Sequence, residues 1–249
     1  MSDQPQNLGV LYIVSGDKYL RAAIHSARSV RLHEPGLPIH LFTADPNSPI
    51  LAAAQGVFDG IDKIENPHRR SKLEYFAKSP FERTLYLDSD TELVAPIRQM
   101  FGILDRFDMA LCHAHWRNHP VTSQVWKTKL PYSYPQFNSG VMLYKRNEKT
   151  DRFFKEWQQN FAAAGLPQDQ VTLRETMWAS DVRLYTLPPE YNIRFWKYLK
   201  LWEKGEVEPR ILHMQKFHDG PLWFVKNWIK GFARGVLGLF GLKPSSFRR

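Results

Sequence analysis

The sequence predicts a single α/β domain built around a mostly parallel β-sheet. Residues 10–55 alternate two apolar runs with two helical patterns, and this alternation is typical of a parallel sheet covered by helices. A later apolar run ends in two carboxylates, Asp88 and Asp90, where strands of such sheets present ligand-binding side chains. The chain has 249 residues and is 43% apolar, which is enough for one sizeable core.

The elements before the carboxylate pair are expected to build most of the sheet. Residues 10–15 form a buried apolar run, and after a Gly-Asp turn the apolar residues of 18–32 recur at helical spacing. A second strand, a short helix and a short edge strand are expected at 38–43, 48–55 and 62–64. These segments supply one complete β-α-β-α unit.

Helices and strands continue to alternate through the rest of the chain. Pro80 stops the helix before the carboxylate pair, and Pro96 lies near the first turn of the helix after it, where proline is tolerated. Residues 116–136 keep no period and are rich in Pro, Tyr, Ser and Thr, which indicates a long functional loop or flap. We expect helices at 69–80, 95–107, 151–164 and 169–180, and strands at 84–87, 109–115, 137–146, 182–188 and 210–214.

Composition limits the compartment and the partners. Cys112 is the only cysteine, so an internal disulfide is impossible and a reducing compartment is compatible. No secretory signal is visible at the N-terminus, and no stretch approaches the roughly 20 apolar residues that span a bilayer. Of the net charge of +9, +6 falls from residue 216 onward. The remaining surface is only mildly basic, and we expect no nucleic-acid partner.

The basic C-terminal segment is expected to stand apart from a domain at residues 1–220. In residues 221–249 the apolar residues follow helical spacing, while Lys226, Lys230 and Arg234 stack on the other face. Such a segment suits an anionic membrane surface. A terminal helix packed on the domain is the alternative, and four glycines weaken either helix.

The carboxylate pair needs a physical explanation, because Asp88 and Asp90 repel each other unless a cation or a proton relieves them. The pair fits an Asx-turn cap, or the nucleophile and acid/base of a haloacid-dehalogenase-like phosphatase, whose D-x-D pair after an apolar strand is matched. It also fits a divalent-metal site that holds a nucleoside diphosphate. The phosphatase pair normally ends the first strand, and no late acidic cluster follows here.

Six segments in order resemble a GT-A-fold glycosyltransferase close to family 8, the group of glycogenin and the bacterial lipopolysaccharide galactosyltransferases. They are "GVLYIVSGDKYLRAAIHSARSVR", "SKLEYFAKSPFERTLYLDSDTELVAP", "FNSGVMLYKR", "DQVTLRET", "LPPEYN" and "ILHM". The resemblance covers about residues 8–220. It implies a Rossmann-like domain that transfers a sugar, with retention of anomeric configuration, from a UDP-sugar to a glycan or glycolipid acceptor.

The resemblance also assigns expected roles around the donor. Asp169 and Gln170 would lie beside the transferred sugar, although Asp169 also suits a helix N-cap. The amide of Asn138 offers a donor and an acceptor to sugar hydroxyls, and the small Gly140 permits close approach of the backbone. A lysine in the position of Lys72 would face the diphosphate. We expect the nucleotide-sugar contacts to come from Ser15, Asp17, Tyr19, Lys72, Ser89 and Lys216.

The third metal ligand is expected to be His213, at the tip of a late strand. An imidazole beside two carboxylates favours Mn²⁺ over Mg²⁺. The family continues H-x-x-G-x-x-K-P-W, whereas this chain has "HMQKFHDGPLW". Lys216 is therefore the expected replacement phosphate contact, and His218 is the alternative ligand.

The leading hypothesis is a manganese- or magnesium-dependent glycosyltransferase at the cytoplasmic side of a membrane, peripheral at its inner face. The loop at 116–136 would close over the donor or shape the acceptor site. An aspartyl phosphatase and a non-catalytic binder of membrane or nucleic acid are the alternatives.

Overall fold

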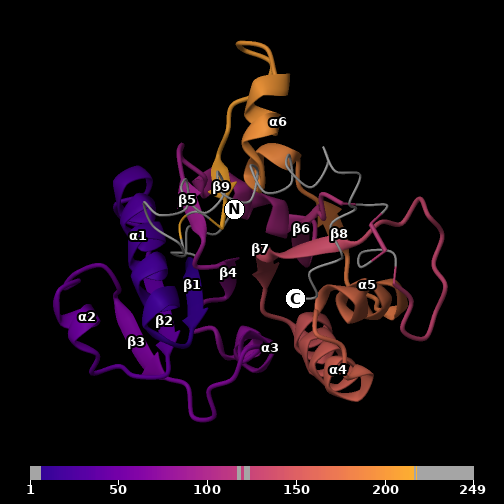
Figure 1. Ribbon diagram of the computed structural model, residues 1–249, viewed down its shortest axis with the longest axis horizontal. Coiled ribbons are helices and arrows are strands. Elements are labelled where there is room, and N and C mark those ends of the chain that lie inside the picture. The colour runs from indigo at the N-terminus through magenta and orange to yellow at the C-terminus, as the bar shows by residue number, and fades with distance from the viewer. Residues whose placement is uncertain (1–6, 117–118, 121–123, 216, 218–249) are drawn as a thin grey trace, which may run out of the picture.

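A computed structural model describes residues 7–116, 119–120, 124–215 and 217. Its main sheet has seven strands in the order β3-β2-β1-β4-β7-β6-β8, with helices on both faces (Figure 1). The predicted α/β class with a mostly parallel sheet is confirmed, because β7 alone among these strands runs against its neighbours.

The first half of the chain forms one half of the sheet. β1 (Leu8–Val14) lies between β2 (Ile39–Thr43) and β4 (Arg83–Leu87), and β3 (Gly60–Lys63) is the edge strand beyond β2. All four are parallel, so their carboxyl ends meet at one edge of the sheet. The first helix, α1 (Asp17–His33), follows β1 directly.

The second half completes the sheet around one antiparallel strand. β7 (Phe137–Lys145) pairs antiparallel with β4 on one side and with β6 (Met109–His113) on the other. The last strand of the sheet, β8 (Leu184–Thr186), is parallel to β6. The helices of this half are α4 (Glu148–Ala164) and α5 (Gln170–Ala179).

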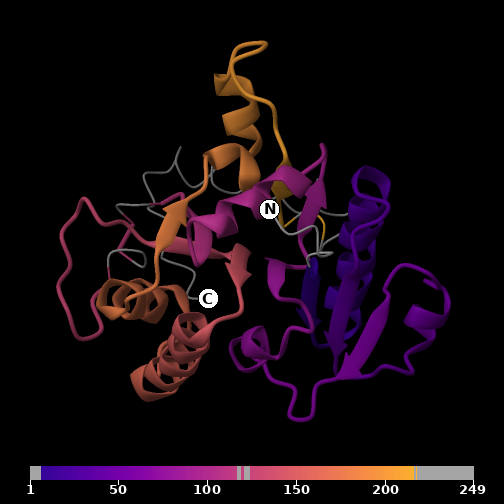
Figure 2. The ribbon, with the colours of Figure 1, turned by 180° about the vertical axis from the view of Figure 1, so that it is seen from behind.

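A second, two-stranded sheet pairs β5 (Thr91–Leu93) with β9 (Ile211–His213). β5 begins directly after the carboxylate pair, and its register places Thr91 opposite His213. The short α6 (Trp196–Leu201) comes before β9 and projects away from the main sheet, as both Figure 1 and Figure 2 show. This small sheet brings the late part of the chain to the carboxylates.

The core has two parts, one on each face of the main sheet. Alternate residues of β1 point to opposite faces: Val10 and Tyr12 pack with α1 and β5, whereas Leu11 and Ile13 pack with α4 and α5. Trp157 of α4 is fully buried and stacks on Phe76. The result is a three-layer sandwich, which the apolar periodicity of strands and helices requires.

Several predicted elements differ in the structure. The helix expected at 69–80 is the single turn α3 (Lys72–Tyr75) followed by the 3₁₀ segment η1 (Phe76–Lys78), because Ser79 takes the extended conformation that the following proline favours. The helix expected at 95–107 is the 3₁₀ segment η2 (Arg98–Asp105), which contains Gly102, a weak helix former. The predictions missed β5 and α6, and they did not assign the strand expected at 210–214, which contains β9, to a second sheet.

The shorter elements are α2 (Pro49–Ala52) and η3 (Pro189–Tyr191). Within the described part of the chain, we find no helix with the length and apolar character needed to cross a bilayer. The predicted helix in the segment 221–249 lies outside the described residues.

Candidate active site

The carboxylate pair lies in a tight connection between two sheets. β4 ends at Leu87 and β5 begins at Thr91, so residues 88–90 turn out of the main sheet. The backbone N–H of Asp88 donates to the carbonyl of Gly140 at 2.7 Å, and Thr91 Oγ1 donates to the Asp88 carbonyl at 2.8 Å. These bonds fix the turn and direct both carboxylates to the same place.

His213 completes a compact group of three metal-ligating side chains. Its Nε2 lies 3.0 Å from Asp90 Oδ1 and 3.7 Å from Asp88 Oδ2, and one potential ligand atom of each residue lies within 4.8 Å of the other two. His213 and Asp90 are buried, with 1% and 6% of their surface exposed. A partly exposed carboxylate, a buried one and an imidazole at this separation suit a divalent cation.

The imidazole of His213 is oriented from behind by Asn192. The Nδ1 of His213 lies 2.8 Å from Asn192 Oδ1, and because that oxygen can only accept, Nδ1 is the protonated nitrogen. The buried Nε2 then presents its lone pair to the carboxylates and has no hydrogen-bond partner in the structure. An unsatisfied buried acceptor between two carboxylates is the strongest sign that the residues fit a metal ion.

Asp88 uses its two oxygens differently. Oδ1 accepts from Tyr86 Oη at 2.6 Å and from Lys72 Nζ at 3.1 Å, whereas Oδ2 faces His213. Burial raises the pKa of Asp88, but the charge of Lys72 and the Tyr86 hydrogen bond lower it, and the pKa lies below its usual value. The carboxylate is therefore ionised at neutral pH and keeps one oxygen for an ion.

Gly140 forms the floor of the group. An ideal Cβ at this position would lie 2.2 Å from His213 Cε1 and 2.6 Å from Asp88 Oδ2. Any larger residue would therefore push the imidazole and the carboxylate apart. The close backbone approach predicted from the small residue is present.

Lys72 joins the carboxylate pair to Asp169. Besides Asp88, its Nζ donates to Ser139 Oγ at 3.2 Å and lies 3.8 Å from Asp169 Oδ2. The Lys72 side chain is only 11% exposed, so it is no solvated surface lysine. Its ammonium lies between two acidic groups at the edge of the sheet.

Asp169 is a buried, ion-paired carboxylate. It makes no side-chain cap for α5, because Oδ1 pairs with Arg70 Nη1 at 2.9 Å and Oδ2 accepts from Ser139 Oγ at 2.9 Å. Arg70 also donates to the carbonyl of Pro167 at 3.0 Å. Arg70 was not predicted, because an Arg-Arg pair is typical of a solvated surface; its spacing of two residues from Lys72 was the available signal.

Asn138 supports His213 through Asn192. Its Oδ1 accepts from the Gly140 N–H and from Asn192 Nδ2, both at 3.0 Å, so this oxygen is already engaged. The Nδ2 group of Asn138 takes no part in these two bonds. No role was predicted for Asn192. Its amide in the segment "LPPEYN", which resembles the family, was the available signal.

The remaining predicted residues lie at the same edge or outside the described chain. Ser15 follows β1, Asp17 begins α1, and Tyr19 is 46% exposed one turn into that helix. Gln170 is the first residue of α5, and Ser89 is buried between the carboxylates. Lys216 and His218 lie outside the described residues, so the structure brings neither to the site.

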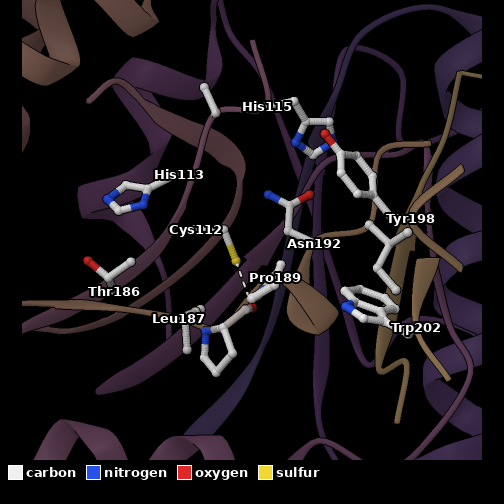
Figure 3. Close-up of a pocket in the computed structure, with 12 residues that line it drawn as sticks. Cys112, His113, His115, Thr186, Leu187, Pro189, Asn192, Tyr198 and Trp202 are labelled. Carbon is white, nitrogen blue, oxygen red and sulfur yellow. Dashed lines mark hydrogen bonds between the residues drawn. The ribbon is translucent and has the colours of Figure 1, made fainter. Parts of the chain in front are cut away.

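A cavity of about 450 Å³ adjoins the metal-ligating group. Asn192, which orients His213, also lines this cavity, and the aromatic side chains of His115, Tyr198 and Trp202 form one wall (Figure 3). The floor includes Cys112, whose thiol lies 3.4 Å from the Pro188 carbonyl. We refer to this space as the aromatic pocket.

Comparison with known proteins gives a family and a fold. Residues 75–220 match the family model described as nucleotide-diphospho-sugar transferase. A structure of the galactosyltransferase LgtC with donor and acceptor sugar analogs is 14% identical, with a TM-score of 0.61 over 89% of this chain and 94% of that chain. An active-site mutant of LgtC is 15% identical, with a TM-score of 0.60 over 83% and 86% of the two chains.

The glycosyltransferase GlyE of Streptococcus pneumoniae TIGR4 is a further similar structure. It is 17% identical, with a TM-score of 0.59, and the likeness covers 84% of this chain but 54% of GlyE. A search of curated protein sequences finds no match. At these identities, the similar structures establish a shared fold.

Proposed function

The chain belongs to the nucleotide-diphospho-sugar transferase family and is a glycosyltransferase, and we propose that it moves a hexose from a UDP-sugar to a glycan or glycolipid with the help of Mn²⁺. The observation that carries the proposal is the buried Nε2 of His213, which has no hydrogen-bond partner and lies 3.0 Å and 3.7 Å from the two carboxylates. Family membership sets aside the aspartyl phosphatase and the non-catalytic binder.

Asp88, Asp90 and His213 would hold the cation. A mixed shell of imidazole and carboxylate ligands favours Mn²⁺, and Mg²⁺ is the alternative. When bound, the ion supplies Lewis-acid stabilisation of the departing diphosphate. The rest of the chemistry falls to side chains of this protein.

Lys72 provides a second positive charge to the diphosphate. Its Nζ contacts Asp88 at 3.1 Å and Ser139 at 3.2 Å. These two contacts hold the ammonium in place at the edge of the sheet. A fixed cation stabilises the charge that develops on the leaving group and needs no reorganisation during the reaction. Lys216 is proposed as a further phosphate contact, in a segment outside the described residues.

Asp169, Gln170 and Asn138 are proposed to position the transferred sugar. Asp169 is positioned by Arg70 and by Ser139, and its oxygens can accept hydrogen bonds from sugar hydroxyls and stabilise positive charge at the anomeric carbon. The Nδ2 group of Asn138 and the amide of Gln170 offer donors. We propose retention of configuration, with the leaving and incoming groups on one face of the sugar.

The nucleotide and the acceptor are assigned to either side of this centre. Ser15, Asp17, Tyr19 and Ser89 would contact the nucleotide-sugar, with the exposed ring of Tyr19 available to pack on the base or ribose. The aromatic pocket would take the acceptor sugar, because it adjoins the metal-ligating group through Asn192. Aromatic walls with few polar groups are typical of small-ligand sites.

Membrane association is proposed for the C-terminal segment. Residues 221–249 combine apolar residues at helical spacing with a basic face, which suits contact with anionic lipid at the cytoplasmic side. We therefore place residues 1–220 in the catalytic domain and the segment after it at the inner face of a membrane.

The proposal is tested by thermal unfolding with UDP, GDP and ADP, each with and without Mn²⁺. A ligand at a hundredfold excess over its dissociation constant adds about 2.7 kcal/mol of stability, and we expect this rise for UDP in the presence of Mn²⁺. Asp90→Asn should abolish the manganese-dependent part. The matched control is Asp181→Asn, which changes only exposed ion pairs with Arg152 and Lys149 and should respond as the unmodified protein does. A melting temperature that no nucleotide raises in a manganese-dependent way would refute the proposal.

A further inference from the structure

A second hollow of about 490 Å³ lies beside the aromatic pocket. Its walls come from α5, from the segment before β7 and from the end of β8, and we refer to it as the α5 groove. The residues used below are His113, Ser133, Tyr134, Met177, Trp178 and Thr186.

The two hollows share lining residues at the ends of two strands. His113 and Thr186 line both of them, and these are the last residues of β6 and β8. Figure 3 shows both side chains on one side of the aromatic pocket, opposite Tyr198 and Trp202. The pocket contains Cys112 from the core on one face of the sheet, and the groove contains Met177 from the core on the other. A ligand in the pocket therefore reaches the groove by passing over this strand edge.

The groove has the chemical character of a carbohydrate subsite. Trp178 is 49% exposed although it is a large apolar residue, and Tyr134 holds its ring edge-to-face at 4.9 Å. The same groove is lined by the hydroxyl-bearing Ser133 and Thr186 and by the imidazole of His113. A pyranose ring needs an aromatic surface for its C–H face and hydrogen-bonding groups for its hydroxyls, and the groove offers both.

The outer wall of the groove is held by two consecutive buried side chains of α5. Arg174 Nε donates to the Tyr134 carbonyl at 2.9 Å, and its Nη2 donates to the Pro131 carbonyl at 3.3 Å. Both Arg174 and Glu175 are more than nine-tenths buried. Charged hydrogen bonds of this kind fix a loop more firmly than neutral ones.

Glu175 anchors the preceding part of the same loop. Its carboxylate accepts from the backbone N–H groups of Trp126 at 2.6 Å, Lys127 at 2.9 Å and Thr128 at 2.8 Å. Residues 124–136 of the loop predicted to be a flap are thus fastened to α5. Since α5 begins beside Asp169, one helix carries both the groove wall and a residue of the proposed donor site.

We propose that the α5 groove binds the second and third sugars of an acceptor glycan whose terminal sugar occupies the aromatic pocket, with Trp178 as the stacking surface. This inference rests on the proposed function. It makes the enzyme selective for an oligosaccharide over a single sugar, because only a longer acceptor reaches past Thr186 to Trp178.

The test uses the full-length protein with UDP and Mn²⁺ on an array of immobilised mono-, di-, tri- and tetrasaccharides. We expect stronger retention on glycans of two or more residues, and an affinity about tenfold lower for these glycans in Trp178→Ala, as when one aromatic anchor is removed. Trp178→Phe should keep most of the affinity. The control is Trp196→Ala on α6, an exposed tryptophan that lines neither hollow and should have no effect.

Three results overturn the inference: no retention on any oligosaccharide, retention that is independent of glycan length, or equal binding by Trp178→Ala and the unmodified protein. Thermal unfolding separates these failures from failure of the proposed function. If Mn²⁺ and UDP still stabilise Trp178→Ala as they stabilise the unmodified protein, the variant is folded and the donor site stands. Only the assignment of the groove is then wrong.

Discussion

Replacing Gly140 with alanine is the sharpest test of the candidate active site, because it adds one methyl group and removes no ligand. The new Cβ would lie 2.2 Å from His213 Cε1, whereas ordinary van der Waals contact begins at 3.4 Å. The imidazole or the strand must therefore retreat by about 1 Å. The same Cβ would lie 2.6 Å from Asp88 Oδ2, so two of the three proposed ligands are displaced together.

The cost to folding and the cost to metal binding differ in size. An added methyl group in a packed site costs about 1–3 kcal/mol, and domains are stable by about 5–15 kcal/mol, so Gly140→Ala should fold. Metal sites tolerate ligand shifts of only about 0.2 Å. We therefore expect Mn²⁺ to bind the Gly140→Ala protein about a hundredfold more weakly, or not measurably.

The assay is a calorimetric titration of Mn²⁺ into the protein in the presence of UDP, with thermal unfolding as a check on folding. Gly102→Ala is the matched control, because it likewise adds one methyl group to a glycine. Gly102 lies in the 3₁₀ segment η2, where the new Cβ would meet nothing within 4 Å. The reasoning fails if Gly140→Ala binds Mn²⁺ as tightly as Gly102→Ala does.

Two further predictions concern the support of the site and the stability of the fold. Asn192→Leu should weaken Mn²⁺ binding about 10- to 100-fold by releasing His213 Nδ1. Asn192→Asp loses the bond to Asn138 but keeps the acceptor for His213 Nδ1, so it should bind Mn²⁺ more tightly than Asn192→Leu; equal titrations of the two variants would contradict this. Asp108→Asn should lower the free energy of unfolding by about 3 kcal/mol at neutral pH, since burial raises the pKa of Asp108 but hydrogen bonds and charge from Arg183 hold it well below its usual value. Because the pKa of Asp108 is lowered in the folded state, this stabilisation is complete above about pH 4 and is lost as the pH falls further. The free energies of unfolding of the two proteins, measured in urea, should therefore converge in acid. A difference that stays constant with pH would refute the assignment.

The sequence predicted the position of a residue wherever that residue stands at the end of one predicted strand. Asp88 and Asp90 follow an apolar run, and the carboxyl ends of parallel strands share one edge, so their place followed from the order of elements. His213 also lies at a strand tip, but its strand is β9 of the small sheet. The expectation of a common site for these three residues did not depend on which sheet holds β9.

Residues in irregular segments could not be assigned in the same way. Arg70 precedes α3 and its partner Asp169 lies 99 residues later, so no local period relates them. Asn192 follows the short 3₁₀ segment η3 and reaches His213 only after the chain has passed through α6. Side-chain pairs of this kind are set by tertiary packing, which a single sequence does not display.

The charges at the site explain how paired carboxylates persist in the fold and how the site suits a diphosphate. Asp88 is paired with Lys72, Asp169 with Arg70, and Asp90 lies 3.9 Å from Arg194 Nη1. Each acid thus has a basic partner, and the group is close to neutral without any ion. With a divalent cation bound, the same group carries an excess of two positive charges, which complements a diphosphate. Cation and nucleotide should therefore strengthen each other's binding by the same factor, because coupling between two ligands is reciprocal.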